Sequence, residues 1–177
     1  AAEDIGIRSE LGYLPESVSL APSLTPREIL TFFAKLDRSK FNDRSKTLRR
    51  IKEVLEVVGL SAASDRQVST FSKGMTQRVG IAQAILHEPK VLVLDEPASG
   101  LDPLGIVEMR ELFSRLNRDL KMTILFSSHS IGEVERVSNR VAIIAKNRLV
   151  KVLERDQWSG SGGRTLETWF LECVKDP

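Results

Sequence analysis

A short apolar run followed by two acids constrains the fold of this chain most strongly. Residues 91–94 read Val-Leu-Val-Leu, and Asp95, Glu96 and Pro97 follow at once. Such a run is typical of a parallel strand that is buried on both faces. Because open α/β sheets bind ligands at the carboxyl ends of their strands, the acids form a candidate site. We expect Asp95 to hold Mg²⁺, directly or through water, and Glu96 to orient or deprotonate an attacking water. The alternative is that both acids only cap the following turn.

The rest of the chain alternates strands and helices. Further strands are expected at residues 11–14, 122–126, 141–145 and 149–153. Helices are expected to begin near Thr25, Asp43, Ser72, Asp102 and Ser130, and after Thr165. Alternating strands and helices with short connections indicate an α/β fold with a mostly parallel sheet and covering helices.

The chain length corresponds to one domain that can carry a subdomain. We expect a helical subdomain over residues 17–87 and an α/β part over residues 88–155. A C-terminal helix is expected over residues 164–177, after a linker rich in glycine and serine at residues 159–163.

Two helix starts have the pattern of a capping box. One pairs Thr25 with Glu28, and the other pairs Ser130 with Glu133. The spacing of the apolar residues predicts that the first of these helices buries one stripe, formed by Ile29, Phe32, Phe33 and Leu36.

Composition excludes several classes of protein. Hydrophobic residues make up 41% and charged residues 28% of the chain, which excludes disordered and collagen-like proteins. The formal net charge of +2 gives no support for a nucleic-acid partner. Cys173 is the single cysteine, so no internal disulfide can form. The strongest apolar run, residues 141–145, is too short to cross a bilayer. We therefore expect an intracellular domain.

Two further segments carry polar groups that suit a phosphate. His129 follows the strand expected at residues 122–126, and an imidazole there could hydrogen-bond a terminal phosphate and the attacking water. The other histidine, His87, is interpreted as structural. The helix start Ser72-Lys73-Gly74 offers a hydroxyl, free amides and a positive charge to an anion. Taken alone, it is an ordinary capped helix.

Together these motifs resemble the nucleotide-binding domain of ATP-binding-cassette (ABC) proteins. Residues 71–75 are similar to the signature motif, and residues 91–97 are similar to the Walker B strand with its catalytic glutamate. Residues 99–102 resemble the D-loop, and His129 matches the switch histidine. Residues 13–16 occupy the position of the Q-loop, so the resemblance covers nearly the whole chain.

Three residues depart from the usual family motifs. In place of the signature Leu-Ser-Gly-Gly-Gln, the chain has Lys73 for the first glycine and Met75 for the glutamine. Glu16 replaces the glutamine of the Q-loop, and an ionised carboxylate cannot donate a hydrogen bond. These variations resemble a branch of ABC exporter ATPases.

The resemblance implies ATP hydrolysis with Mg²⁺. Glu96 and His129 would be catalytic, and Asp95 and Glu16 would contact the metal. The residues that would contact ATP across a dimer of two such domains are Ser72, Lys73, Gly74, Met75 and Asp102. The dimer could be a homodimer or a heterodimer. Its closure on ATP would drive a membrane-spanning permease, which places the protein in the cytoplasm, on the inner face of the cell membrane.

A phosphate-binding loop (P-loop) is missing from this sequence. That loop needs Gly-x-x-x-x-Gly-Lys followed by Ser or Thr, and the chain contains no Gly-Lys pair. We therefore expect a domain truncated at its N-terminus, which is inactive alone. Its sheet would lack the strand of the phosphate loop, so that Leu14 and residues 91–94 would have unpaired or less covered neighbours.

Two other functions are compatible with the motifs. The chain could belong to a soluble ABC ATPase of translation or DNA repair, although the short connection between Glu16 and Ser72 speaks against the coiled-coil insertions of repair enzymes. It could also be a remnant that supplies only a signature helix to an intact partner. The presence of Glu96 and His129 argues against this second alternative.

Overall fold

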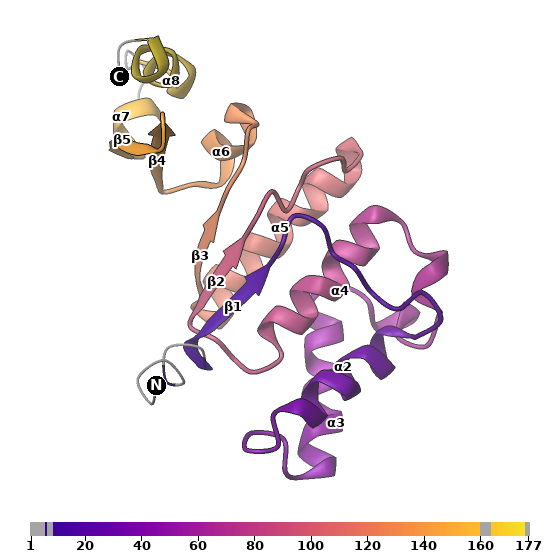
Figure 1. Cartoon of the computed structure of the whole chain (residues 1–177). Helices are drawn as coiled ribbons and strands as arrows, with labels where there is room; N and C mark the ends of the chain where they lie inside the picture. Colours follow the sequence, from indigo (N-terminus) through magenta and orange to yellow (C-terminus); the bar gives the residue numbers. More distant parts are fainter. Residues whose placement is uncertain (1–5, 7–8, 160–163, 176–177) are drawn as a thin grey trace. The chain divides into compact units, whose positions relative to one another are not determined.

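The computed structural model describes residue 6, residues 9–159 and residues 164–175. The chain divides into two compact units, residues 1–127 and residues 128–177. The main elements of the first unit are β1 (Leu11–Leu14), α2 (Pro26–Leu36), α3 (Arg44–Val57), α4 (Lys73–Ile85), β2 (Val91–Leu94), α5 (Pro103–Leu120) and β3 (Thr123–Phe126) (Figure 1). Two short 3₁₀ helices, Ser61–Ala63 and Val68–Thr70, lie between α3 and α4.

The first unit contains a parallel sheet of three strands in the order β1-β2-β3. Leu14 of β1 pairs with Leu94 of β2, which pairs with Phe126 of β3. The three strands therefore end at the same level, and β2 has a partner on both sides. The predicted α/β fold with a parallel sheet and covering helices is confirmed.

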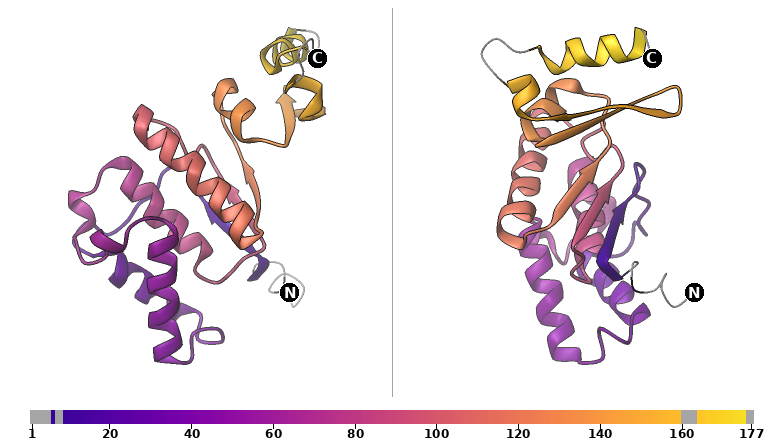
Figure 2. Two further views of the ribbon diagram at one scale, coloured as in Figure 1. Left: turned by 180° about the vertical axis from the view of Figure 1, so that it is seen from behind. Right: turned by 90° about the vertical axis from the view of Figure 1, so that its left-hand side faces the viewer.

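Helices α4 and α5 cover one face of this sheet (Figure 2). Two glycines let α4 approach closely: a Cβ at Gly12 would collide with the Ala84 carbonyl oxygen, and a Cβ at Gly80 would lie 2.5 Å from Leu14 Cδ1. On the side of β3, the rings of Phe113 and Phe126 pack with centroids 5.8 Å apart. This face forms the core of the sheet.

The opposite face of the sheet is exposed in the described part of the chain. Leu11, Tyr13 and Leu125 are 39%, 56% and 61% exposed, and they alternate with buried residues in β1 and with half-buried residues in β3. Leu14 itself points to the face that α4 covers and is 1% exposed, but its neighbour Tyr13 is on the exposed face. Strand β2 is paired on both sides, whereas β1 and β3 each have one edge without a partner strand among the described residues. The predicted loss of cover therefore concerns the neighbours of Leu14 and of β2, and one face of the sheet.

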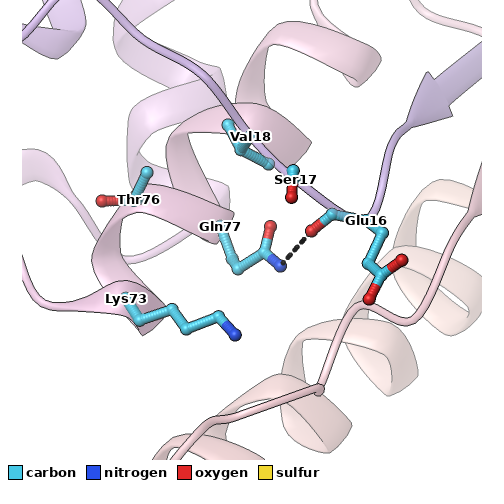
Figure 3. A pocket seen from close by; sticks show the side chains of 6 residues that line it. All are labelled: Glu16, Ser17, Val18, Lys73, Thr76 and Gln77. Carbon is cyan, nitrogen blue, oxygen red and sulfur yellow. Dashed lines mark hydrogen bonds between the residues drawn. The ribbon is translucent and has the colours of Figure 1, made fainter.

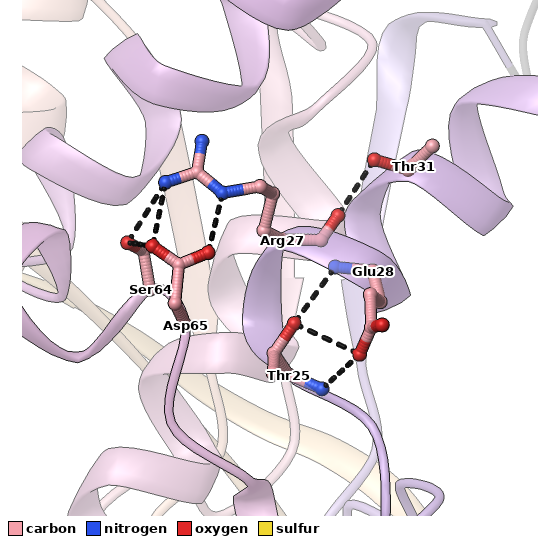
Figure 4. A network of polar contacts seen from close by, with 6 residues as sticks. All are labelled: Thr25, Arg27, Glu28, Thr31, Ser64 and Asp65. Atoms are coloured by element: carbon pink, nitrogen blue, oxygen red, sulfur yellow. Dashed lines mark hydrogen bonds and ion pairs between the residues drawn. The ribbon is translucent and has the colours of Figure 1, made fainter.

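Helix α2 begins with the predicted capping box. The Thr25 hydroxyl accepts the Glu28 N–H, and the Glu28 carboxylate accepts the Thr25 N–H at 2.9 Å (Figure 4). Arg27, in the same turn, binds the Asp65 carboxylate at 2.7 and 3.0 Å and so ties α2 to the segment after α3. The predicted stripe is wrong in part, because Phe32 and Leu36 are exposed.

The buried face of α2 includes Leu30 and Ala34, which were not part of the predicted stripe. Helix α3 is capped by the Asp43 carboxylate, which accepts the Ser45 and Lys46 N–H groups. It ends at Val57 with Val58 as its C-cap, and the predicted stop, Gly59, follows with a φ of +71° at which a residue other than glycine would be strained.

The second unit contains an antiparallel hairpin and three helices. These elements are α6 (Ile131–Val137), β4 (Arg140–Ala145), β5 (Arg148–Glu154), α7 (Asp156–Ser159) and α8 (Leu166–Lys175). The core of this unit is formed by Ile143, Leu153, Trp158, Leu166 and Cys173. Of the predicted linker, residues 160–163 lie outside the described residues.

The predicted capping box at Ser130 is wrong. The Ser130 side chain makes no capping hydrogen bond, and the Ser130 N–H donates to the Ser128 hydroxyl at 3.1 Å. The Glu133 N–H donates to the Ser130 carbonyl oxygen instead. Both backbone donors of the box are thus already satisfied. In the part of the chain that the structure describes, no helix has the length and apolarity to span a bilayer.

Candidate active site

Because the three strands end at the same level, the predicted acids Glu16, Asp95 and Glu96 follow them at one edge of the sheet. Glu16 follows β1 after Pro15, and Asp95 and Glu96 follow β2 directly. Two backbone hydrogen bonds fix this edge: the Asp95 N–H donates to the Leu14 carbonyl oxygen at 2.9 Å, and the Ser127 N–H donates to the Leu94 carbonyl oxygen at 3.0 Å. The edge is where an open α/β sheet binds its ligand.

The Ser127 hydroxyl joins the two acids. It donates to Asp95 Oδ1 at 2.6 Å and accepts the Glu96 N–H at 2.8 Å. Glu96 sits at a φ of +44°, a backbone conformation that is uncommon for a residue with a side chain and is frequent at functional sites. The sequence motifs gave Ser127 no role. The sequence feature that could have indicated such a role is a serine directly after β3, because the register of the two strands places it beside the acid directly after β2.

The Asp95 carboxylate suits a hard cation such as Mg²⁺. Its Oδ1 is held by Ser127, and in the described residues its Oδ2 accepts no hydrogen bond. No group of three or more His, Cys, Asp or Glu side chains there could hold a metal by itself. Mg²⁺ keeps several waters and binds through one or two carboxylates plus substrate phosphates, so the single carboxylate of Asp95 fits that mode.

The start of α4 has the features of the predicted anion site. The Ser72 hydroxyl accepts the Met75 N–H at 3.3 Å, and both Ser72 and Lys73 are exposed. A Cβ at Gly74 would lie 3.7 Å from Leu101 Cδ2, so this turn packs against the loop that precedes α5. The first turn of α4 contains no acid that would oppose an anion.

Asp102 lies at the end of that loop and caps α5. Its Oδ1 accepts the Gly105 N–H at 2.8 Å, and Pro103 occupies the first turn. The capping role of Asp102 is therefore confirmed. Its predicted contact with ATP across a dimer stays a prediction.

A small polar pocket of about 200 Å³ lies between the segment after β1 and the first turns of α4 (Figure 3). Glu16, Ser17 and Val18 form one side of it. Lys73, Thr76 and Gln77 form the other side. Gln77 is 2% exposed, and its Nε2 makes a long hydrogen bond of 3.5 Å to the Glu16 carbonyl oxygen. Gln77 was not predictable as a pocket residue, because a glutamine inside a helix has no distinctive sequence pattern.

The two histidines lie in different units. His129 belongs to the second unit and is exposed, so its catalytic role stays a prediction from the sequence. The His87 ring lies in the first unit with Nε2 3.1 Å from the Leu11 carbonyl oxygen. Burial lowers the pKa of His87, which favours the neutral ring. This contact supports the structural interpretation of His87.

Comparison with known proteins gives matches over most of the chain. The family model for ABC transporters matches residues 3–99, just over half of the chain. Residues 3–99 include β1, α4 and the acids after β2. The chain is 42% identical to the ABC transporter ATP-binding protein all4389 of Nostoc sp. over 98% of the chain and 55% of that protein.

Two relatives with assigned roles match comparably well. The bacitracin transport ATP-binding protein BcrA of Bacillus licheniformis is 39% identical over 91% of the chain and 51% of its own length. The linearmycin resistance ATP-binding protein LnrL of Bacillus subtilis is 34% identical over 90% of the chain and 50% of its own length. The chain thus spans about half the length of such relatives.

A solved structure supports the fold. A metal-chelate type ABC transporter in an inward-facing conformation superposes with a TM-score of 0.78 at 23% identity. The match covers 94% of the chain and 63% of that structure.

Proposed function

The chain belongs to the family of ABC transporter ATP-binding proteins, and we propose that it forms part of the ATP-hydrolysing subunit of an exporter. The observation that carries this proposal is the Ser127 hydroxyl, which holds Asp95 and Glu96 together at the end of the sheet. The names of BcrA and LnrL, which refer to bacitracin transport and linearmycin resistance, favour an exporter.

In this proposal Glu96 is the general base. Its carboxylate takes a proton from a water as that water attacks the terminal phosphorus of ATP, and the bond to the ADP oxygen breaks. Asp95 would hold Mg²⁺, which neutralises charge on the phosphates when bound. The Ser127 hydroxyl fixes the Asp95 carboxylate and the Glu96 backbone, so both acids keep one relative position. We assign His129 to the same reaction from its place in the sequence, as a hydrogen-bond donor to the terminal phosphate.

The start of α4 would serve a second nucleotide-binding domain. Ser72 and Gly74 would contact the terminal phosphate of ATP held mainly by the partner, with Lys73 and Met75 in the same turn. Asp102 would face the partner from the loop before α5, and Glu16 would reach metal or water from the end of β1. The exposure of Ser72, Lys73 and Asp102 supports this arrangement. The dimer would drive a membrane-spanning permease from the cytoplasmic side.

A P-loop has to come from polypeptide outside these residues. The support is twofold: the sequence has no Gly-Lys pair, and one apolar face of the sheet is exposed at Leu11, Tyr13 and Leu125. A contiguous apolar face of this kind marks an interaction surface. We propose that the missing part of the domain covers it. The complete protein here means the polypeptide that includes this part, and the 177-residue chain alone would bind ATP weakly.

The test is Glu96→Gln in the complete protein. Removing the base should lower the rate of ATP hydrolysis by roughly 10²–10⁴-fold and leave ATP binding intact, so that the closed dimer accumulates with ATP. The control is Glu111→Gln, the same change at an exposed residue of α5, which should leave the rate unchanged. Normal turnover in Glu96→Gln would remove Glu96 from the catalytic role.

A further inference from the structure

The Lys73 side chain lies over the loop that precedes α5. A Cβ at Gly100 would be 2.5 Å from Lys73 Nζ, so the ammonium occupies the space that a side chain at position 100 would need. Lys73 is exposed, and it makes no hydrogen bond or ion pair with another described residue. The ammonium is therefore held in this position only weakly.

The pocket beside Lys73 contains one buried acceptor that lacks a donor. The Gln77 side chain is buried, and its Oε1 has no hydrogen-bond partner among the described residues. Glu16 lines the same pocket with its backbone, while its exposed carboxylate points away from Gln77 (Figure 3) and forms no ion pair in the described part of the chain. A buried acceptor without a donor is unfavourable, so a donor that enters the pocket would stabilise the fold.

Lys73 is the donor best placed to enter. It is four residues before Gln77 on α4, a spacing that brings two side chains onto the same helix face. Figure 3 shows both side chains on the helix side of the pocket, opposite Glu16. A lysine ammonium has three donors on a flexible stem, so it can bind Gln77 Oε1 and the Glu16 carboxylate together.

We propose that Lys73 is a positioning residue whose ammonium exchanges between two positions. In one it lies over Gly100, and in the other it enters the pocket and binds Gln77 and Glu16. The second position draws residues 16–18 toward α4 and leaves the space over Gly100 open. Glu16 and Lys73 are also two places where charged residues replace uncharged residues of the usual motifs. The link to ATP hydrolysis rests on the proposed function, whereas the exchange itself does not.

The test is a double-mutant cycle with Glu16→Gln and Lys73→Met in the complete protein, read from urea unfolding. The cycle is run in the natural background and with Gly100→Ala, whose Cβ takes the space of the Lys73 ammonium. We expect Gly100→Ala to increase the coupling between Glu16 and Lys73. Expressed as a factor in the unfolding equilibrium constant, the increase should be about threefold, which is the effect typical of an ion pair on a protein surface. The carbon signal of the Gln77 side-chain carbonyl should shift with it in NMR spectra, and Lys73→Met should abolish that shift.

Two controls separate this exchange from general effects. Gly59→Ala adds a side chain at a φ of +71°, close to the +66° of Gly100, but without a lysine in its way, so it should leave the coupling unchanged. Lys52→Met, on the exposed side of α3, should add independently to Glu16→Gln. If Glu16→Gln and Lys73→Met are additive in both backgrounds and the Gln77 signal does not move, the pocket holds only water and the proposal is wrong. Absence of ATP hydrolysis in the unmutated protein would refute the proposed function alone, since the cycle needs no turnover.

Discussion

Replacing Ser127 by alanine tests whether its hydroxyl organises the site. Ser127→Ala removes the 2.6 Å hydrogen bond to Asp95 and the 2.8 Å hydrogen bond from the Glu96 N–H. Because both bonds are exposed, each contributes about 1 kcal/mol, and their loss lowers the free energy of unfolding by about 2 kcal/mol. That is a factor of roughly 30 in the folded-to-unfolded ratio.

The assay is urea unfolding of the complete protein together with ATPase kinetics. At a slope of about 2 kcal/mol per molar urea, the midpoint should fall by about 1 M with no change in the slope. The turnover number should fall by roughly 10²-fold because the acids lose their common position, while KM changes little. Ser127→Thr keeps the hydroxyl and should restore both quantities. An alanine variant with a normal midpoint and normal turnover would refute the role of Ser127.

Three further changes test the fold. Leu14→Ala should lower the free energy of unfolding by about 3 kcal/mol in urea unfolding, because Leu14 fills the space beside Gly80. The control is Tyr13→Ala at the neighbouring exposed position, which should change the free energy of unfolding of the 177-residue chain by less than about 0.5 kcal/mol. Hydrogen bonds from Arg27 and Ser64 hold the pKa of Asp65 at about 2. A carboxylate whose pKa is lowered in the folded protein stabilises the fold at pH values above its unfolded pKa, which is near 3.8. This contribution is lost as the pH falls toward 2. Asp65→Asn should therefore flatten the dependence of stability on pH between these values, and an unchanged profile would contradict the assignment. We expect the exposed apolar face to make the 177-residue chain self-associate, and Leu125→Lys should reduce this in light scattering. The same change should destabilise the complete protein, where residue 125 is expected to be covered, and no effect in either protein would refute the covered face.

Local patterns predicted the elements that carry the site. The run Val91–Leu94, the capping residues Thr25, Ser72 and Asp102, and the stop at Gly59 are each determined by a few neighbouring residues, and the structure has them where the sequence placed them. Such signals depend on backbone hydrogen bonding within one turn or one strand.

Features that depend on distant neighbours were not predictable in this way. The stripe on α2 was wrong because Phe32 has the spacing of a core residue, yet Leu30 and Ala34 are the residues that the neighbouring helices cover. The role of Ser127 depends on the register between β2 and β3. That Gln77 Oε1 has no hydrogen-bond partner among the described residues depends on how the segment after β1 crosses α4. Neither register nor crossing is encoded in a short window of sequence.

Helix α4 is held on the sheet over its second half, and this has a mechanical consequence. It is about 20 Å long, and the two close approaches described above, at Gly80 and at Ala84, lie between its middle and its end. The stretch from Ser72 to Gly80 is about 12 Å long, and it extends beyond both contacts. A tilt of this stretch by about 10° moves the Ser72 end by roughly 2 Å, whereas the Ile85 end stays in place. A force on the first turns of α4 therefore moves the turn that carries Ser72 and Lys73 without displacing the end that lies on the sheet.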